Sequence, residues 1–128
     1  MYDSLKKLLD KAYAPYSNFP VAAIVKTKDN KYFFGVNVEN ASFGGTICAE
    51  RNALNSAIGA GYRSSDIQEL HVLVNSTKHA YPCYLCRQTI SELCNSDMII
   101  KLYNIDNKVI EVKYDDLISF PFEKENLQ

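Results

Sequence analysis

The fold is decided by residues 31–61, KYFFGVNVENASFGGTICAERNALNSAIGAG, which pass from an apolar stretch through a polar loop into an alanine-rich stretch. Residues 31–36 are largely aromatic and apolar, which predicts a strand. Residues 37–47 are rich in Asn, Ser, Gly and Thr and predict a loop. Residues 48–60 carry an apolar stripe that ends among glycines, which predicts a helix. This unit places a helix against a sheet.

The flanking segments extend this unit into a larger sheet. Residues 21–25 are apolar throughout, as is typical of a strand buried on both faces. The short polar turn that follows them predicts an antiparallel hairpin with residues 31–36. Further helices are expected at residues 3–13, 83–94 and 114–118, and further strands at residues 70–74, 98–103 and 108–112.

The order of these elements predicts an α/β protein, a three-layer α/β/α sandwich with a mixed five-stranded sheet. The sheet must be mixed because two pairs of strands are tight hairpins, whereas helices connect the middle strands. There is no internal repeat, low-complexity tract or linker. We therefore expect residues 1–128 to form a single domain.

The composition is typical of a globular protein that acts on small molecules. Hydrophobic residues make up 47% of the chain, and 14 basic residues nearly balance 15 acidic ones. This balance disfavours nucleic acid, which requires a basic face. No apolar run approaches the roughly 20 residues that span a bilayer, and the first residues lack the apolar stretch of a signal peptide. We expect a cytoplasmic protein with no nucleic-acid or membrane partner.

Three of the four cysteines lie at the predicted starts of two helices. Cys-Ala-Glu at residues 48–50 opens one helix, and Pro-Cys-Tyr-Leu-Cys at residues 82–86 opens the other. The two thiols of the second motif are three positions apart, hence on one face of the first turn. Side chains at a helix start tilt toward its N-terminal end, so the thiol and the carboxylate of the first motif can converge there.

This cluster predicts a catalytic zinc site with Cys48, Cys83 and Cys86 as ligands and Glu50 as the acid–base group. Three sulfur ligands leave one position of a tetrahedral Zn²⁺ open, which distinguishes catalytic sites from structural ones. The ion lowers the pKa of a water in that position toward roughly 7. A carboxylate that is not a ligand can then transfer protons, and Glu50 fits that task.

The charge of this site requires compensation. Three thiolates leave a bound Zn²⁺ with a net negative charge, which would weaken its effect on water. The dipoles of the two helix N-termini offset part of that charge. Arg51 and Arg87 both lie near predicted ligands in the sequence. We assign Arg51 to the immediate surroundings of the ligands, while the choice between Arg51, Arg87 or both as the group that offsets the thiolate charge stays open.

Other interpretations of the cysteines remain open. A Cys-x-x-Cys pair can be redox-active or structural, although a redox pair has no need of an upstream Cys-x-Glu. A structural zinc site would recruit a fourth ligand, for which Cys94 is the spare thiol. Because Cys94 follows Cys86 by about two helical turns, we expect it to pack in the core.

Residues 35–51, GVNVENASFGGTICAER, resemble the core of the small cytidine deaminases, and so do residues 16–21 and 82–88. Cys-x-Glu followed by Pro-Cys-x-x-Cys is a metal-binding pattern of the zinc deaminases. The likeness runs from the first helix to Phe122. Within that family the chain is similar to the homotetrameric, three-cysteine branch that acts on free nucleosides. This resemblance implies the cytidine deaminase-like fold.

The resemblance also implies roles outside the metal site. It implies that Asn37 and Glu39 bind the ribose 3′-hydroxyl, and their spacing at a strand end puts both on one side. It implies that Phe19 stacks near the pyrimidine and that the backbone of Ala49 reads the base carbonyl. It further implies that Phe122 reaches the site of a neighbouring subunit, hence a homotetramer with shared sites.

We therefore expect hydrolytic deamination of cytidine and 2′-deoxycytidine to uridine and 2′-deoxyuridine with release of ammonia, as in pyrimidine salvage. A deaminase of another aminopyrimidine nucleoside, such as blasticidin S, is the alternative enzyme. A non-catalytic zinc module and a thiol–disulfide oxidoreductase are more distant alternatives. The chain departs from the family at Ala22, Tyr81, Tyr84, Leu85 and Ser119, which leaves the exact shape of the pocket open.

Overall fold

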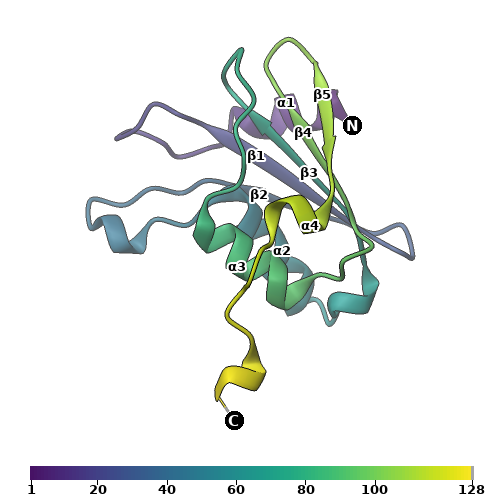
Figure 1. The fold of residues 1–128 in the computed structure, drawn as a ribbon. Helices are drawn as coiled ribbons and strands as arrows, with labels where there is room; N and C mark the ends of the chain where they lie inside the picture. Colours follow the sequence, from purple (N-terminus) through teal and green to yellow (C-terminus); the bar gives the residue numbers. More distant parts are fainter. Residues whose placement is uncertain (128) are drawn as a thin grey trace.

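A computed structural model describes residues 1–127 and contains one mixed five-stranded sheet in the order β2-β1-β3-β4-β5 (Figure 1). Strands β3 and β4 run parallel, and the other three neighbouring pairs are antiparallel. This confirms the predicted α/β class with a mixed sheet. The strands are β1 (Val21–Thr27), β2 (Tyr32–Val36), β3 (Ile67–Val74), β4 (Ile99–Tyr103) and β5 (Val109–Val112).

Helices cover both faces of the sheet. Helices α2 and α3 lie side by side on one face (Figure 1), where Ala53 and Ile90 are fully buried in the larger apolar core. Helix α1 covers the opposite face with Leu5 and Leu9. None of the helices in residues 1–127 is long and apolar enough to cross a bilayer. The helices are α1 (Tyr2–Leu9), α2 (Ala49–Gly59), α3 (Tyr84–Leu93) and α4 (Tyr114–Leu117).

The first helix is shorter than predicted, because α1 ends at Leu9 and not at residue 13. Beyond Leu9 the chain forms tight turns, and Tyr13 then pairs with the segment that follows β2. The Tyr13 N–H donates to the Asn37 carbonyl at 3.0 Å, and the Tyr13 carbonyl accepts from the Glu39 N–H at 2.8 Å. This long-range pairing outweighs the helix propensity of residues 10–13 and brings residues 13–20 beside Asn37 and Glu39.

Strand β3 is longer than predicted, because it begins at Ile67 and not at residue 70. The added residues continue the antiparallel ladder with β1, in which Glu69 lies opposite Lys26. The Lys26 ammonium and the Glu69 carboxylate are 3.4 Å apart and hold this end of the ladder together.

Gly35 on β2 sets the position of α2. A Cβ atom at Gly35 would lie 2.3 Å from the Ala49 carbonyl oxygen and 2.4 Å from the Ala53 nitrogen. Both obstructing atoms are backbone, so only a residue without a side chain lets α2 approach the strand this closely. The first turn of α2 is therefore seated directly on the sheet.

We expect Gly35→Ala to lower the free energy of unfolding by about 1–3 kcal/mol, because α2 must move away from β2 to admit the new methyl group. Urea denaturation measures the change. Gly59→Ala is the matched control, since a Cβ atom there meets nothing within 4 Å, and its effect should stay within about 1 kcal/mol. Equal stability of the two variants would contradict the close approach.

Candidate active site

The N-termini of α2 and α3 meet and bring three thiols together. Cys48 and Cys83 are the residues that cap these two helices. Their sulfur atoms are 3.6 Å apart, and the sulfur atoms of Cys48, Cys83 and Cys86 all lie within 4.8 Å of one another. The backbone N–H of Cys86 also points at the Cys83 sulfur, at 3.5 Å.

This geometry suits a zinc ion. A Zn–S bond of about 2.3 Å in a tetrahedral site separates neighbouring sulfur atoms by about 3.8 Å, close to the 3.6 Å between Cys48 and Cys83. Among residues 1–127, the three cysteines form the group able to hold a metal, and Cys94 is not part of it. Cys94 packs in the core at the end of α3, as predicted. The donor set is therefore three thiols with room for one further ligand.

The thiols of this cluster differ in acidity. The pKa of Cys48 is lowered, chiefly by a hydrogen bond from the Cys86 thiol and further by Arg51. The same hydrogen bond, together with burial, raises the pKa of Cys86. Within this pair the negative charge is therefore favoured on Cys48 rather than on Cys86. Because zinc binds thiolates, loading of the metal must release the remaining thiol protons.

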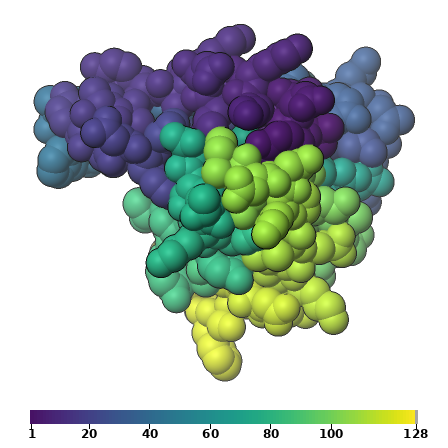
Figure 2. Space-filling model, turned by 90° about the horizontal axis from the view of Figure 1, so that it is seen from above, coloured from purple at the N-terminus to yellow at the C-terminus, as the bar shows by residue number. Residues whose placement is uncertain are grey.

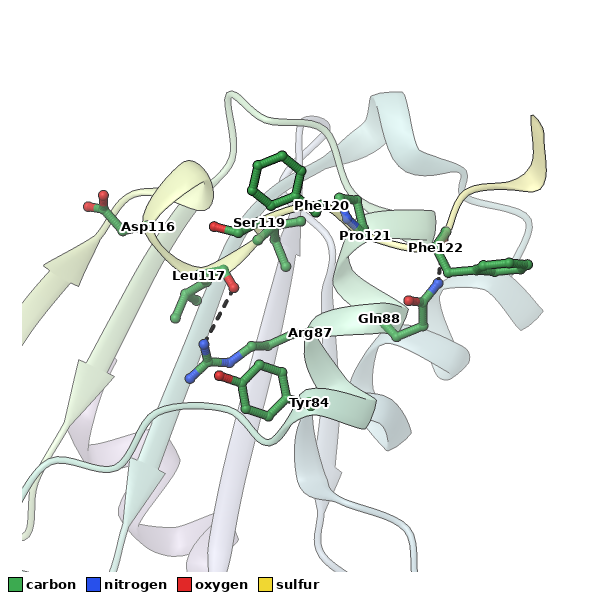
Figure 3. A pocket seen from close by; sticks show the side chains of 10 residues that line it. Tyr84, Arg87, Gln88, Asp116, Leu117, Ser119, Phe120, Pro121 and Phe122 are labelled. Atoms are coloured by element: carbon green, nitrogen blue, oxygen red, sulfur yellow. Dashed lines mark hydrogen bonds between the residues drawn. The ribbon is translucent and has the colours of Figure 1, made fainter. Parts of the chain in front are cut away.

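Of the two candidate arginines, Arg51 is the one that contacts a thiol. Its Nη2 atom lies 3.7 Å from the Cys48 sulfur and 3.4 Å from the Thr46 carbonyl. Arg87 instead donates from Nε to the Pro82 carbonyl at 2.8 Å and from Nη1 to the Leu117 carbonyl at 3.4 Å (Figure 3). Arg51 therefore offsets thiolate charge directly, whereas Arg87 ties the loop before α3 to the C-terminal segment.

Glu50 lies in the first turn of α2 with only 6% of its surface exposed. Burial, with a smaller contribution from the nearby charge of Cys48, raises the pKa of its carboxyl to about 7. A group with a pKa near neutrality can both accept and donate a proton during turnover. These features suit the acid–base role predicted for Glu50, and that role stays a prediction.

A cavity of about 290 Å³ opens onto this cluster. It is bounded by the helix starts on one side and by the ends of β1, β2 and β3 on the other. One end of the cavity thus carries thiols able to bind a metal and a titratable carboxyl group. The other end carries polar and aromatic side chains. The predicted site residues that line it are Phe19, Asn37, Glu39, Cys48, Ala49, Glu50 and Cys83.

The side chains of Asn37 and Glu39 already hold the loop before β1. The Asn37 amide donates to the Phe19 carbonyl at 2.9 Å and accepts from the Val21 N–H at 2.8 Å. One oxygen of Glu39 accepts from the backbone N–H groups of Tyr16 and Ser17 at 2.9 and 3.0 Å. A hydrogen bond from the Ser17 hydroxyl is the main cause that lowers the pKa of Glu39.

Phe122 lies outside this cavity. It belongs to the C-terminal segment, which projects from the rest of the molecule (Figures 1 and 2). Its carbonyl accepts a hydrogen bond from the Gln88 amide at 2.8 Å, and its ring points away from Arg87 (Figure 3). Phe122 therefore does not line the cavity of its own chain. Its predicted contact with the site of a neighbouring subunit stays a prediction.

Several residues that line the cavity were not assigned a role from the sequence. Ser17 lies within residues 16–21, which carry part of the family resemblance, but its partner Glu39 is 22 positions away and no local pattern links them. Val72 and Val74 could be predicted only as strand residues, since nothing local tells which face meets a cavity. The unassigned lining residues are Ser17, Val21, Thr46, Val72, Val74, Ala80 and Tyr81.

Comparison with known proteins gives a consistent picture. Residues 1–102 match the family model described as the cytidine and deoxycytidylate deaminase zinc-binding region. A cytidine deaminase of Sporosarcina psychrophila is 38% identical over 122 residues, which cover 95% of this chain and 88% of that protein.

Solved structures agree with the sequence matches. The crystal structure of cytidine deaminase from Burkholderia pseudomallei superposes with a TM-score of 0.88 at 42% identity and covers 94% of each chain. That of cytidine deaminase from Mycobacterium tuberculosis gives a TM-score of 0.77 at 28% identity, and covers 94% of this chain and 93% of that one.

We expect Cys86→Ala to lose zinc and Cys94→Ala to keep it, because only the first removes a sulfur atom from the cluster. Each substitution removes a buried sulfur atom, one within α3 and one at its C-terminal end. Each variant therefore controls for a loss of stability in the other. Metal content of the purified variants, measured by atomic absorption, decides the outcome. Loss of zinc from Cys94→Ala would indicate a closed four-thiolate site instead.

Proposed function

The chain belongs to the cytidine and deoxycytidylate deaminase family, and from this membership we propose that it hydrolyses the 4-amino group of cytidine and 2′-deoxycytidine. Water replaces the amino group at C4, so that uridine or 2′-deoxyuridine and ammonia are the products. The observation that carries the proposal is a buried Glu50 that lines the same cavity as Cys48 and Cys83, two of the three clustered thiols.

Cys48, Cys83 and Cys86 would hold the zinc ion of this family. When bound, the ion supplies a water acidic enough to act as a nucleophile at neutral pH. Arg51 stabilises the thiolate form of Cys48 through the contact at 3.7 Å. The N-terminal ends of α2 and α3 add favourable dipoles. These features support a site that tolerates three thiolates.

Glu50 carries the protons in this proposal. Its carboxylate takes a proton from the attacking water and donates it to N3 of the pyrimidine while the hydroxide adds to C4. A second transfer moves the proton of the new hydroxyl to the amino group, which leaves as ammonia. A pKa of about 7, raised by burial, suits both transfers. Positioned proton transfer of this kind contributes about 10²–10⁴-fold to a rate.

Asn37 and Glu39 are proposed to bind a sugar hydroxyl. Their contacts to the loop before β1 use one acceptor and one donor position of the Asn37 amide and three acceptor positions of the Glu39 carboxylate. Besides a second acceptor position on the Asn37 oxygen, what remains is a donor on Asn37 and an acceptor on Glu39. A hydroxyl group can accept from the one and donate to the other, which supports the ribose 3′-hydroxyl as their ligand.

Phe19 and Ala49 are proposed to hold the base. Phe19 lines the cavity and is partly exposed, so its ring can offer a face on which a pyrimidine stacks. Ala49 lies between Cys48 and Glu50 and also lines the cavity, and its backbone is proposed to read the base carbonyl. A carbonyl of the base held there would keep C4 on the side of the thiols.

We further propose a homotetramer in which Phe122 completes the cavity of a neighbouring subunit. Support comes from the apolar residues that the single chain leaves uncovered near the start of α3 and in the C-terminal segment. Tyr84, Leu85 and Phe120 expose 81%, 64% and 101% of their surface. Such a patch on a single chain is typical of a subunit interface.

We also propose that residues 1–128 form a single domain that works in the cytoplasm. One sheet takes in all five strands, which supports the first statement. All four cysteines are free, and three of them must stay reduced to bind metal, which supports a reducing compartment.

Glu50→Gln should retain zinc and lower kcat at least 10²-fold for cytidine, because the amide fills the same space but cannot transfer the proton. Loss of cytidine absorbance measures turnover. Glu92→Gln, on an exposed part of α3, is the control and should behave like the parent protein. Full activity of Glu50→Gln would disprove the assignment.

Phe122→Ala should weaken cytidine binding, and mixing it with Glu50→Gln should restore part of the loss. In mixed tetramers, a Glu50→Gln subunit donates an intact Phe122 to a subunit whose own Glu50 is intact. Both variants are refolded together, and the activity is compared with the sum of the two separate samples. A monomer in light scattering, or a mixture no more active than that sum, would contradict shared sites.

A further inference from the structure

The loop that carries Phe19 has no regular secondary structure, yet side chains hold it on both sides. The Phe19 N–H donates to the Ser17 hydroxyl oxygen at 3.0 Å. The Phe19 carbonyl accepts from the Asn37 amide at 2.9 Å. Both peptide groups next to the Phe19 ring are thus fixed by polar side chains rather than by a strand or a helix. Of these two side chains, only Asn37 has a proposed role in binding substrate.

Ser17 also contacts the residue proposed to bind the sugar. Its hydroxyl donates to one carboxylate oxygen of Glu39, while its backbone N–H donates to the other oxygen at 3.0 Å. The single hydroxyl therefore accepts from the Phe19 backbone and donates to Glu39 at the same time. A hydroxyl has one donor and two acceptor positions, so it can make both bonds, and alanine can make neither.

The two bonds orient the acceptor that Glu39 has left for a ligand. The backbone N–H groups of Tyr16 and Ser17 share one Glu39 oxygen, and the Ser17 hydroxyl takes one position of the second oxygen. Rotation of the carboxylate would break the hydroxyl bond, so the free position keeps a fixed direction. Ser17 itself lines the cavity. Its position thus links the sugar side of the pocket to the base side.

We propose that Ser17 is a positioning residue whose hydroxyl couples the Glu39 carboxylate to the backbone of Phe19, and so aligns the sugar-binding and base-binding sides of the cavity. This inference rests on the proposed roles of Glu39 and Phe19. It adds a residue that takes no part in proton transfer and sets how the substrate lies.

Ser17→Ala should lower kcat/KM for cytidine by about 10- to 100-fold, mainly through KM, because a hydrogen bond to a charged group is lost. Ser17→Thr keeps the hydroxyl and should recover most of the activity. Ser76→Ala is the matched control. The Ser76 hydroxyl accepts from the Lys78 N–H at 3.1 Å, the same type of turn as that of Ser17 and Phe19, but Ser76 lies outside the cavity. This variant should have the parent's kinetics.

A substrate without the sugar hydroxyl separates positioning from general loosening. If Ser17 acts through Glu39, Ser17→Ala should cost much less with 3′-deoxycytidine than with cytidine, by at least threefold in kcat/KM. An equal loss with both substrates, or no loss with either, would overturn the proposal.

Amide exchange tests the coupling without any turnover. In NMR spectra of the zinc-loaded protein, Ser17→Ala should speed exchange of the Phe19 amide about tenfold or more, and Ser76→Ala should not change it. Unchanged exchange at Phe19 would overturn the coupling even if cytidine is a substrate. Faster exchange in a protein that leaves cytidine intact would instead reject the proposed function and keep the Ser17 contact.

Discussion

The thiols of Cys48 and Cys83 come within 3.6 Å of each other because two helices begin at the same place over the sheet. Metal binding and the proposed catalysis both depend on this approach of the two helix starts. Gly35 allows α2 to sit directly on β2, so the helix start cannot drift from the strand ends. The helix N-termini favour negative charge, and Arg51 contacts the Cys48 sulfur at 3.7 Å. The fold thus brings the ligands together and stabilises their charge.

Reactivity and recognition are built from different parts of the chain. The helix starts supply the thiols and Glu50, all anchored by regular secondary structure. The opposite side of the cavity is formed by the loop before β1 and the residues just after β2. There the side chains of Asn37 and Glu39 form the hydrogen bonds to the loop backbone that a neighbouring strand would otherwise form. The side chains proposed to bind the sugar therefore also support the loop that carries the proposed base-stacking ring. Changes in these residues should alter substrate fit before they alter the metal.

The sequence predicts what depends on local spacing and misses what depends on long-range contacts. Cysteine spacing at two helix starts, and the alternation of helices with hairpins, are local, and so the fold class and the thiol cluster could be predicted. The end of α1 could not, because Tyr13 pairs with residues far along the chain. Nor could the sequence tell which arginine offsets the thiolate charge, since Arg51 and Arg87 both lie near ligands and only the fold turns Arg87 toward Leu117.

The most direct test of the central claim measures zinc and cytidine deamination in the same purified sample. We predict one zinc ion per chain and a fall in cytidine absorbance with release of an equal amount of ammonia. We also predict that activity disappears when zinc is removed and returns in proportion to the zinc added back. Stoichiometric zinc with no change in cytidine, or full deamination by the zinc-free protein, would contradict the account.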